Sequence, residues 1–112
     1  MSNEPQPLKI IQKKYGKTPA VFVKRIHDMC LLGEDTISVT SFSGIPEGIY
    51  AYPYPFFTEQ MGYTSIHCSM ILKKLRDVGI LIRVKIGGTP FYHVNYEHPD
   101  VVNSGIFKDG IA

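Results

Sequence analysis

The stretch that decides the fold is residues 56–96, which read FFTEQMGYTSIHCSMILKKLRDVGILIRVKIGGTPFYHVNY. It opens with a short apolar segment, Phe56–Met61, and a three-residue break precedes a longer segment, Ser65–Val78. The longer segment follows a hydroxyl residue suited to an N-cap (Thr64 or Ser65) and ends before Gly79, a frequent helix stop. Its apolar residues recur at helical spacing and form one face: Cys68, Ile71, Leu72, Leu75 and Val78. The pattern predicts two helices, over 56–61 and 65–78.

A strand–turn–strand pattern follows these helices directly. Residues 80–86 are apolar and β-branched, apart from Arg83 and Lys85, and are typical of a strand. The next two residues are Gly87 and Gly88, and both can take the positive φ that a tight hairpin turn requires. Residues 90–96 supply the returning strand. We therefore expect a β-hairpin over 80–96 that carries two basic side chains.

Two more helices are expected upstream. Residues 8–15 predict a short helix that ends at Gly16. Thr18 is suited to an N-cap and Pro19 to the first helical position of a second, mostly buried helix over 19–32, which Gly33 ends. Its apolar residues recur at helical spacing: Val21 or Phe22, Val23, Ile26, Met29, Cys30 and Leu32.

Residues 36–52 have a different character. Thr36–Thr40 alternates polar and apolar residues and is β-branched, which predicts a strand. Turn-forming residues fill 43–48, and residues 49–52 can form a second strand that stops at Pro53. The pattern leaves two alternatives open here, a hairpin or an extended surface loop.

A short helix, a break, an amphipathic helix and a hairpin, in this order, are the organisation of a winged helix-turn-helix domain. The expected fold class is therefore α+β: a small, mainly helical domain with a C-terminal β-hairpin wing and a possible extra hairpin near 36–52. The length of 112 residues fits a single domain over 1–112, with loose tails at 1–7 and 99–112.

Double-stranded DNA is the partner expected for this fold. The second helix of such a domain enters the major groove, and the hairpin reaches the phosphates beside it. The predicted DNA-binding residues lie in these two elements: Ser65, His67, Ser69, Met70, Lys73, Lys74, Arg83 and Lys85. Ser65, His67 and Ser69 stand where base edges are reached, and the four cations where phosphates are met. The lysines near the N-terminus, Lys13, Lys14 and Lys17, are further candidates for phosphate contact.

The segment SIHCSMILKKLRDVGIL, residues 65–81, resembles the recognition-helix region of the winged-helix domains that begin many phage and plasmid replication proteins. The segment PAVFVKRIHDMC (19–30) resembles the upstream helix of those domains, and FYHVNY (91–96) resembles their wing strand. The likeness covers Pro19 to Tyr96. It implies a mobile-element protein that binds duplex DNA, accessory to replication, segregation or transcriptional control. That family commonly has arginines where this chain has Ser65, His67, Ser69 and Met70.

The alternative function is that of a small phage-type interaction protein, which uses a winged-helix scaffold to bind or inhibit another protein. An arginine-poor second helix and a net charge of only +2, from 12 Lys and Arg against 10 Asp and Glu, favour it. Tyr50, Tyr52 and Tyr54 are its candidate contact surface, because tyrosine is enriched at interface cores. Packing against the domain core explains the same aromatic run. A second copy of the chain is another candidate partner, since two-fold dimers match palindromic sites.

Patterns typical of catalysis are not found. The four histidines, His27, His67, His93 and His98, stand in no spacing typical of a nucleophile–base pair or a metal site, and there is no glycine-rich phosphate loop. We therefore expect no enzymatic activity, cofactor or metal. Cys30 and Cys68 lie in apolar helical stretches, which predicts free buried thiols in a cytoplasmic protein; a disulfide or a metal pair is the alternative. The apolar runs are too short for a membrane helix.

Overall fold

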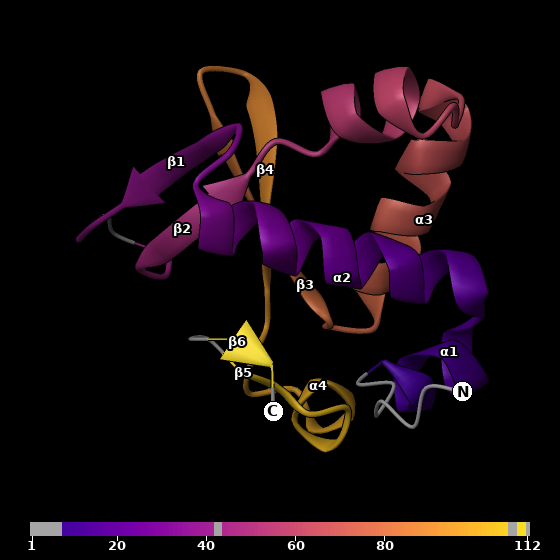
Figure 1. Cartoon of the computed structure of the whole chain (residues 1–112). Helices are drawn as coiled ribbons and strands as arrows, with labels where there is room; N and C mark the ends of the chain where they lie inside the picture. Colours follow the sequence, from indigo (N-terminus) through magenta and orange to yellow (C-terminus); the bar gives the residue numbers. More distant parts are fainter. Residues whose placement is uncertain (1–7, 42–43, 108–109, 112) are drawn as a thin grey trace.

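Helices α2 and α3 pack on a four-stranded antiparallel sheet in the computed structural model (Figure 1). The structure describes residues 8–41, 44–107 and 110–111. The elements in chain order are α1 (Lys9–Tyr15), α2 (Lys17–Leu32), β1 (Thr36–Val39), β2 (Gly48–Ala51), the π-helical turn η1 (Phe56–Gln60), α3 (Ser65–Asp77), β3 (Leu81–Ile86), β4 (Thr89–Val94), α4 (Pro99–Asn103), β5 (Ile106–Phe107) and β6 (Gly110–Ile111). The sheet has the order β1-β2-β4-β3, and β5 pairs with β6 separately. The expected α+β class is confirmed.

The two N-terminal helices meet at Gly16, which has a φ of 107°. Because α2 begins at Lys17 with Gly16 as its N-cap, the prediction that Thr18 caps the helix and that Pro19 opens it is wrong. Pro19 is tolerated since it still lies in the first turn, where backbone N–H groups have no partner within the helix. Gly33 ends α2 in the left-handed conformation, as expected. None of the helices in the described ranges combines the length and the apolar composition needed to span a bilayer.

The main core lies between α2, α3 and the sheet. The ring of Phe22 in α2 stacks on that of Phe57 in η1, with centroids 3.6 Å apart, and both rings are fully buried. The predicted apolar face of α3 is buried at Cys68, Ile71, Leu72 and Leu75. Val78 was expected on that face but is exposed, because α3 ends at Asp77 and Val78 is its C-cap. Burial of this face contributes about 1.5–3 kcal/mol for each large side chain and turns the polar side of α3 outward.

Strands β1 and β2, which lie in the segment where the sequence left a hairpin or a loop open, pair with each other in an antiparallel hairpin. Strand β1 pairs with β2 from Thr36 opposite Ala51 to Val39 opposite Gly48. Ala51 of β2 lies opposite Tyr92 of β4, so this hairpin joins the predicted hairpin of β3 and β4 in one sheet. The turn between β3 and β4 uses Gly87 and Gly88 with φ of 59° and 82°, as the sequence predicts. The β3–β4 hairpin is therefore part of a four-stranded sheet, and pairing of β4 with β2 supports it.

The three tyrosines of the aromatic run, Tyr50, Tyr52 and Tyr54, are all at least partly buried. Tyr50 is fully buried in a second, small cluster with Val39 and Val84, and its hydroxyl donates to the carbonyl of Pro46 at 2.9 Å. The expectation that Tyr50 belongs to a partner-binding surface is therefore wrong. Tyr52 and Tyr54 are partly buried.

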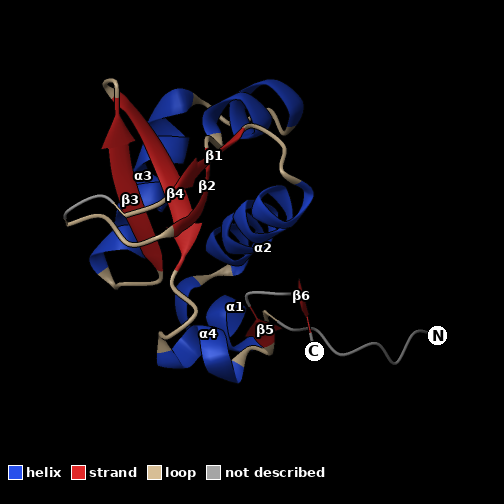
Figure 2. Cartoon of the chain, turned by 90° about the vertical axis from the view of Figure 1, so that its left-hand side faces the viewer, coloured by secondary structure: helices blue, strands red, loops and turns tan. Residues whose placement is uncertain are grey.

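The segment that follows β4 packs against the domain. α4 lies beside α1 at the lower end of the sheet (Figure 2), and Val101 and Ile106 are buried in the main core. The β3–β4 hairpin is thus not C-terminal, and the prediction of a loose tail from residue 99 is wrong for 99–107. Its apolar residues were too few and too widely spaced to predict a helix, yet they close the core beside α1. The predicted tail at 1–7 lies outside the described residues, as do 108–109 and 112.

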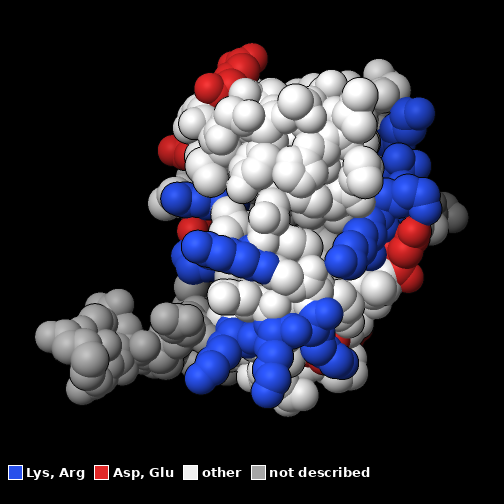
Figure 3. Space-filling model, turned by 90° about the vertical axis from the view of Figure 1, so that its right-hand side faces the viewer, with Lys and Arg blue, Asp and Glu red and all other residues white. Residues whose placement is uncertain are grey.

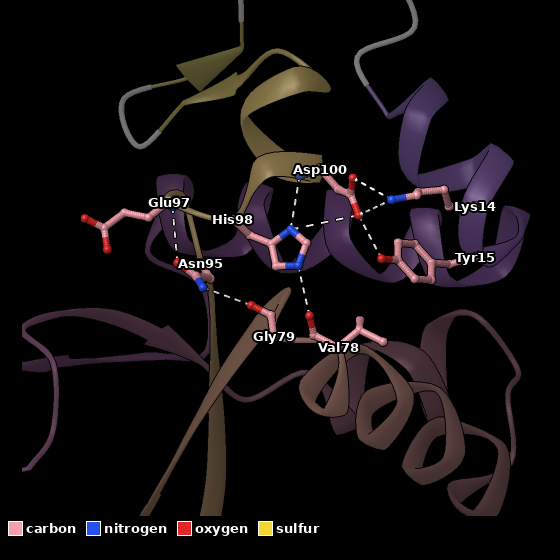
Figure 4. A network of polar contacts seen from close by, with 8 residues as sticks. All are labelled: Lys14, Tyr15, Val78, Gly79, Asn95, Glu97, His98 and Asp100. Carbon is pink, nitrogen blue, oxygen red and sulfur yellow. Dashed lines mark hydrogen bonds and ion pairs between the residues drawn. The ribbon is translucent and has the colours of Figure 1, made fainter.

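Asp100 joins this segment to α1 (Figure 4). The Nζ of Lys14 lies 3.2 Å from Asp100 Oδ1, and the hydroxyl of Tyr15 donates to Oδ2 at 2.7 Å. His98 caps α4: its Nδ1 accepts from the Asp100 N–H at 3.1 Å, while its Nε2 donates to the carbonyl of Val78 at 2.9 Å. We call Lys14, Tyr15, His98 and Asp100 the Asp100 network. It connects α1 and α4 to the C-terminal end of α3.

Candidate nucleic-acid interface

The outward side of α3 carries the predicted base-reading residues. Thr64 caps the helix, since its Oγ1 accepts from the His67 N–H at 3.1 Å and so fixes the first turn. The ring of His67 packs edge-on against Tyr63, with centroids 5.2 Å apart. The predicted side chains on the first two turns are all exposed: Ser65, His67, Ser69 and Met70. Ile66, which the sequence prediction omitted, is exposed beside them.

A polar cleft of about 200 Å³ lies between α3 and the β3–β4 hairpin. We call it the cation cleft, and its lining residues are Tyr54, Ser69, Lys73, Arg76, Arg83 and Tyr92. Ser69, Lys73 and Arg76 are spaced i, i+4 and i+7 on α3 and therefore share one side of the helix. Arg83 comes from β3, where it stands opposite Tyr92 of β4. Three cations from two elements thus converge on one cavity, and none of the six lining residues is acidic.

Hydroxyl groups complete the lining of the cation cleft. The hydroxyl of Tyr54 lies 2.6 Å from the Oγ of Ser69, in a hydrogen bond in which either can donate. Burial raises the pKa of Tyr92, and the nearby guanidinium groups of Arg83 and Arg76 act in the opposite direction. Tyr92 is therefore a neutral phenol at physiological pH. Neutral hydroxyls beside guanidinium groups form a donor-rich surface, which suits an anion with several acceptor oxygens.

One acidic residue stands at the edge of this surface. The Nζ of Lys73 lies 2.7 Å from Oδ2 of Asp77, one helical turn away, and both side chains are exposed. The hydrogen bond from Lys73 lowers the pKa of Asp77, so this carboxylate is ionised at neutral pH. Exposed ion pairs contribute little to stability, and Lys73 can therefore exchange Asp77 for a bound anion.

The cation cleft unites three of the predicted residues, Ser69, Lys73 and Arg83. Lys74 lies outside it, since its Nζ donates to the carbonyl of Tyr15 in α1 at 3.2 Å. Lys85 is exposed on the same side of β3 as Arg83 but beyond the cleft. Arg76, which the prediction omitted, supplies the third cation; its i+3 spacing from Lys73 is a signal in the sequence. Tyr54 and Tyr92 gave no such signal, because only tertiary packing brings them here.

A second group of basic side chains lies over α1 and α2. Figure 3 shows basic residues around a central area of neutral side chains, not in one continuous patch. A groove of about 320 Å³ on these helices is lined in part by Lys17, Lys24 and Arg25. Lys24 pairs with Asp28 at 2.7 Å, and the guanidinium carbon of Arg25 lies 5.4 Å from the centroid of Phe56. Lys24 and Arg25 are thus engaged within the protein, as Lys14 is in the Asp100 network.

The histidines away from α3 have structural contacts. Nδ1 of buried His27 lies 2.6 Å from the Tyr96 hydroxyl, and Nδ1 of His93 lies 2.8 Å from the Ile49 carbonyl. Both cysteines are free and buried, as expected, and burial raises the pKa of Cys30 to about 12, which makes it a poor nucleophile. In the part of the chain that the structure describes, no three or more His, Cys, Asp or Glu side chains are grouped to hold a metal ion.

Comparison with known proteins identifies no relative: no family model, no curated protein and no solved structure matches the chain.

Proposed function

We propose that the chain binds double-stranded DNA, with the outward side of α3 in the major groove and the β3–β4 hairpin as a wing beside it. The cation cleft is the observation that carries this proposal. Lys73, Arg76 and Arg83 converge there with the hydroxyls of Ser69 and Tyr54. Cations and neutral donors together match the charge and the acceptor oxygens of a backbone phosphate.

The arrangement of the elements supports a winged helix-turn-helix. η1, a short break and α3 follow one another, and the β3–β4 hairpin comes next. α2 packs against α3, and the sheet holds the base of the hairpin. A bound phosphate between α3 and the hairpin would fix the register of the helix in the groove, because phosphate contacts position the protein and base contacts specify the sequence.

The resemblance of residues 19–96 to domains of phage and plasmid replication proteins extends this proposal to the biological role. We propose a non-catalytic, DNA-binding accessory of a mobile element, acting in replication, segregation or transcriptional control. In this proposal different residues anchor the DNA and read its bases. The cations of the cleft contact the DNA phosphate backbone, and the exposed first two turns of α3 contact the bases.

A second candidate function is favoured by a specific feature of α3. Its outward side presents Ile66 and Met70 to solvent, and Asp77 interrupts the row of basic residues. A groove of about 370 Å³ runs along Met70, Lys73, Lys74, Asp77 and Val78. Such a mixed apolar and charged surface also suits a protein partner, as in a phage-type interaction protein.

The test of DNA binding is a salt titration of affinity with one duplex. Each phosphate contact that is removed should lower the magnitude of the slope of log K against log [salt] by about one unit. The double variant Arg76→Ala/Arg83→Ala should therefore lose about two units of slope. The control is Lys24→Ala/Arg25→Ala, which removes the same charge from α2, where both cations already have partners within the protein, and should keep the wild-type slope.

Equal slopes for the two double variants would mean that the cation cleft holds no phosphate. If the wild-type protein binds no duplex from a random pool even at low ionic strength, the DNA proposal fails altogether, and the interaction-protein candidate remains.

A further inference from the structure

Two large apolar side chains stand on the part of α3 that faces a bound duplex in our proposal. Ile66 is 73% exposed and Met70 is 65% exposed. They are four residues apart on a 13-residue helix, so they lie one above the other on the same side. Neither side chain contributes to the core of the domain, because other residues form the buried side of α3.

The remaining exposed residues on these two turns limit the ways in which bases can be read. They are Ser65, His67 and Ser69, which carry hydroxyl and imidazole groups. Guanine is usually read by Arg or Lys, and adenine by Asn or Gln. None of these residue types occurs between Ser65 and Leu72. Apolar contact is therefore the strongest means of discrimination that this surface offers.

We propose that Ile66 and Met70 read the C5-methyl groups of thymines in the major groove, so that the protein prefers A·T-rich duplexes. This inference rests on the proposed DNA binding. Thymine is the base that presents an apolar group in the major groove, and it presents it beside hydrogen-bonding groups that serine can meet.

Charge complementarity on both sides of the two residues favours a nucleic acid as the occupant. The cation cleft, with Lys73 and Arg76, lies along one side of α3. Lys74 lies on the other, toward α1. Asp77 lies on the same side of α3 nearly two turns beyond Met70, and its carboxylate is paired with Lys73. The apolar strip, with cations on both sides, matches a groove floor that carries methyl groups between two phosphate backbones.

The spacing of the two side chains also fits. Residues four apart on a helix have Cβ atoms about 6 Å apart. Successive base pairs are about 3.4 Å apart along the duplex axis. The separation of the two side chains is therefore close to two base-pair steps, and each can cover a methyl group on a different base pair.

The experiment compares thymine with uracil, which has the same hydrogen-bonding groups and lacks only the methyl. The duplex most enriched from a random pool by the wild-type protein is synthesised with thymine and again with uracil at every thymine position. Loss of each contacted methyl should weaken binding about fourfold, which is the value of one buried methyl-sized group. Loss of two should weaken it about fifteenfold.

The variants assign the effect to the two residues. Ile66→Ala/Met70→Ala should bind the thymine and uracil duplexes equally, because the side chains that sense the methyl are gone. The matched control is Leu32→Ala, which removes an apolar side chain of similar exposure (71%) at the end of α2. It should keep the full preference for thymine.

Four outcomes would overturn the inference. Equal affinity of the wild-type protein for the two duplexes, or enrichment of G·C pairs alone, would leave DNA binding intact and remove the thymine contact. The wild-type protein could instead form a concentration-dependent dimer that Ile66→Ala/Met70→Ala abolishes, while replacing thymine by uracil leaves its affinity for the duplex unchanged. That result would assign the two side chains to contact with a second copy of the chain. If no duplex is bound at all, this inference falls together with the proposed function.

Discussion

Two groups of charged residues flank α3, and they differ in what their cations face. In the Asp100 network, Lys14 and Tyr15 converge on a carboxylate whose side chain is only 10% exposed. In the cation cleft, Lys73, Arg76 and Arg83 converge on a cavity without an acidic residue in its lining. Asp77 lies at the edge of this cleft, in an exposed ion pair with Lys73.

This difference distinguishes cations that stabilise the fold from cations that are available to bind a ligand. A lysine that meets a buried carboxylate is occupied, and removing its partner destabilises the fold. Cations that meet an open cavity contribute little to folding and can bind an anion that arrives from solution. The Asp100 network should therefore govern stability, and the cation cleft should govern binding.

The largest expected effect concerns stability. Asp100→Asn removes the charge that accepts from Tyr15 and Lys14, and it should lower the free energy of unfolding by about 2 kcal/mol, as for a lost hydrogen bond to a charged group. Urea denaturation measures it. The control is Asp28→Asn, which breaks the pair with Lys24 at a more exposed carboxylate (25% against 10%) and should cost about 0.5 kcal/mol or less. Equal losses in the two variants would remove the contrast between the buried and the more exposed carboxylate.

The same carboxylate predicts a pH dependence. The hydrogen bond from Tyr15, followed by the hydrogen bond and charge of Lys14, lowers the pKa of Asp100 below its ordinary value of 3.8. Its contribution is therefore complete above that value and is lost as the pH falls through it toward the lower folded-state pKa. The stability difference between the wild-type protein and Asp100→Asn should be constant near neutral pH and shrink below about pH 4. A difference that persists unchanged into strong acid would contradict the assignment.

A smaller effect is expected from Tyr15→Phe. This change removes one hydroxyl donor to Asp100 and leaves the ring and Lys14 in place, so it should cost about 1 kcal/mol. Thermal denaturation of the variant alone and combined with Asp100→Asn tests the coupling. The two changes should cost less together than the sum of their separate costs, because both act on the same hydrogen bond: one removes its donor and the other the charge of its acceptor.

The smallest effect should appear in the cation cleft. Asp77→Asn makes the same chemical change as Asp100→Asn, yet it should leave stability unchanged and strengthen duplex binding about threefold at low salt. The acid at the edge of the cleft is then gone, and Lys73 is released to a phosphate. Weaker binding by Asp77→Asn would show that Asp77 holds Lys73 in its productive position.

Local patterns in the sequence were sufficient to place α1, α3, most of α2 and the β3–β4 hairpin. The spacing of Cys68, Ile71, Leu72 and Leu75 fixed which side of α3 is buried, and therefore which side carries Ser65, His67, Ser69 and Met70 outward. The pair Gly87-Gly88 fixed the turn between β3 and β4. These features depend on backbone conformation and on the period of apolar residues, and both can be read over a few neighbouring positions.

Tertiary structure alone decided which of the cations meet. The sequence places Lys73, Lys74, Arg83 and Lys85 in one predicted set, but packing turns Lys74 toward α1 and brings Arg76 and Tyr54 to Arg83. It also decided that 99–107 closes the core, where Lys14 and Asp100 meet across 86 positions of sequence. Contacts between distant segments depend on how whole elements pack, and no local pattern of residues encodes the outcome of that packing.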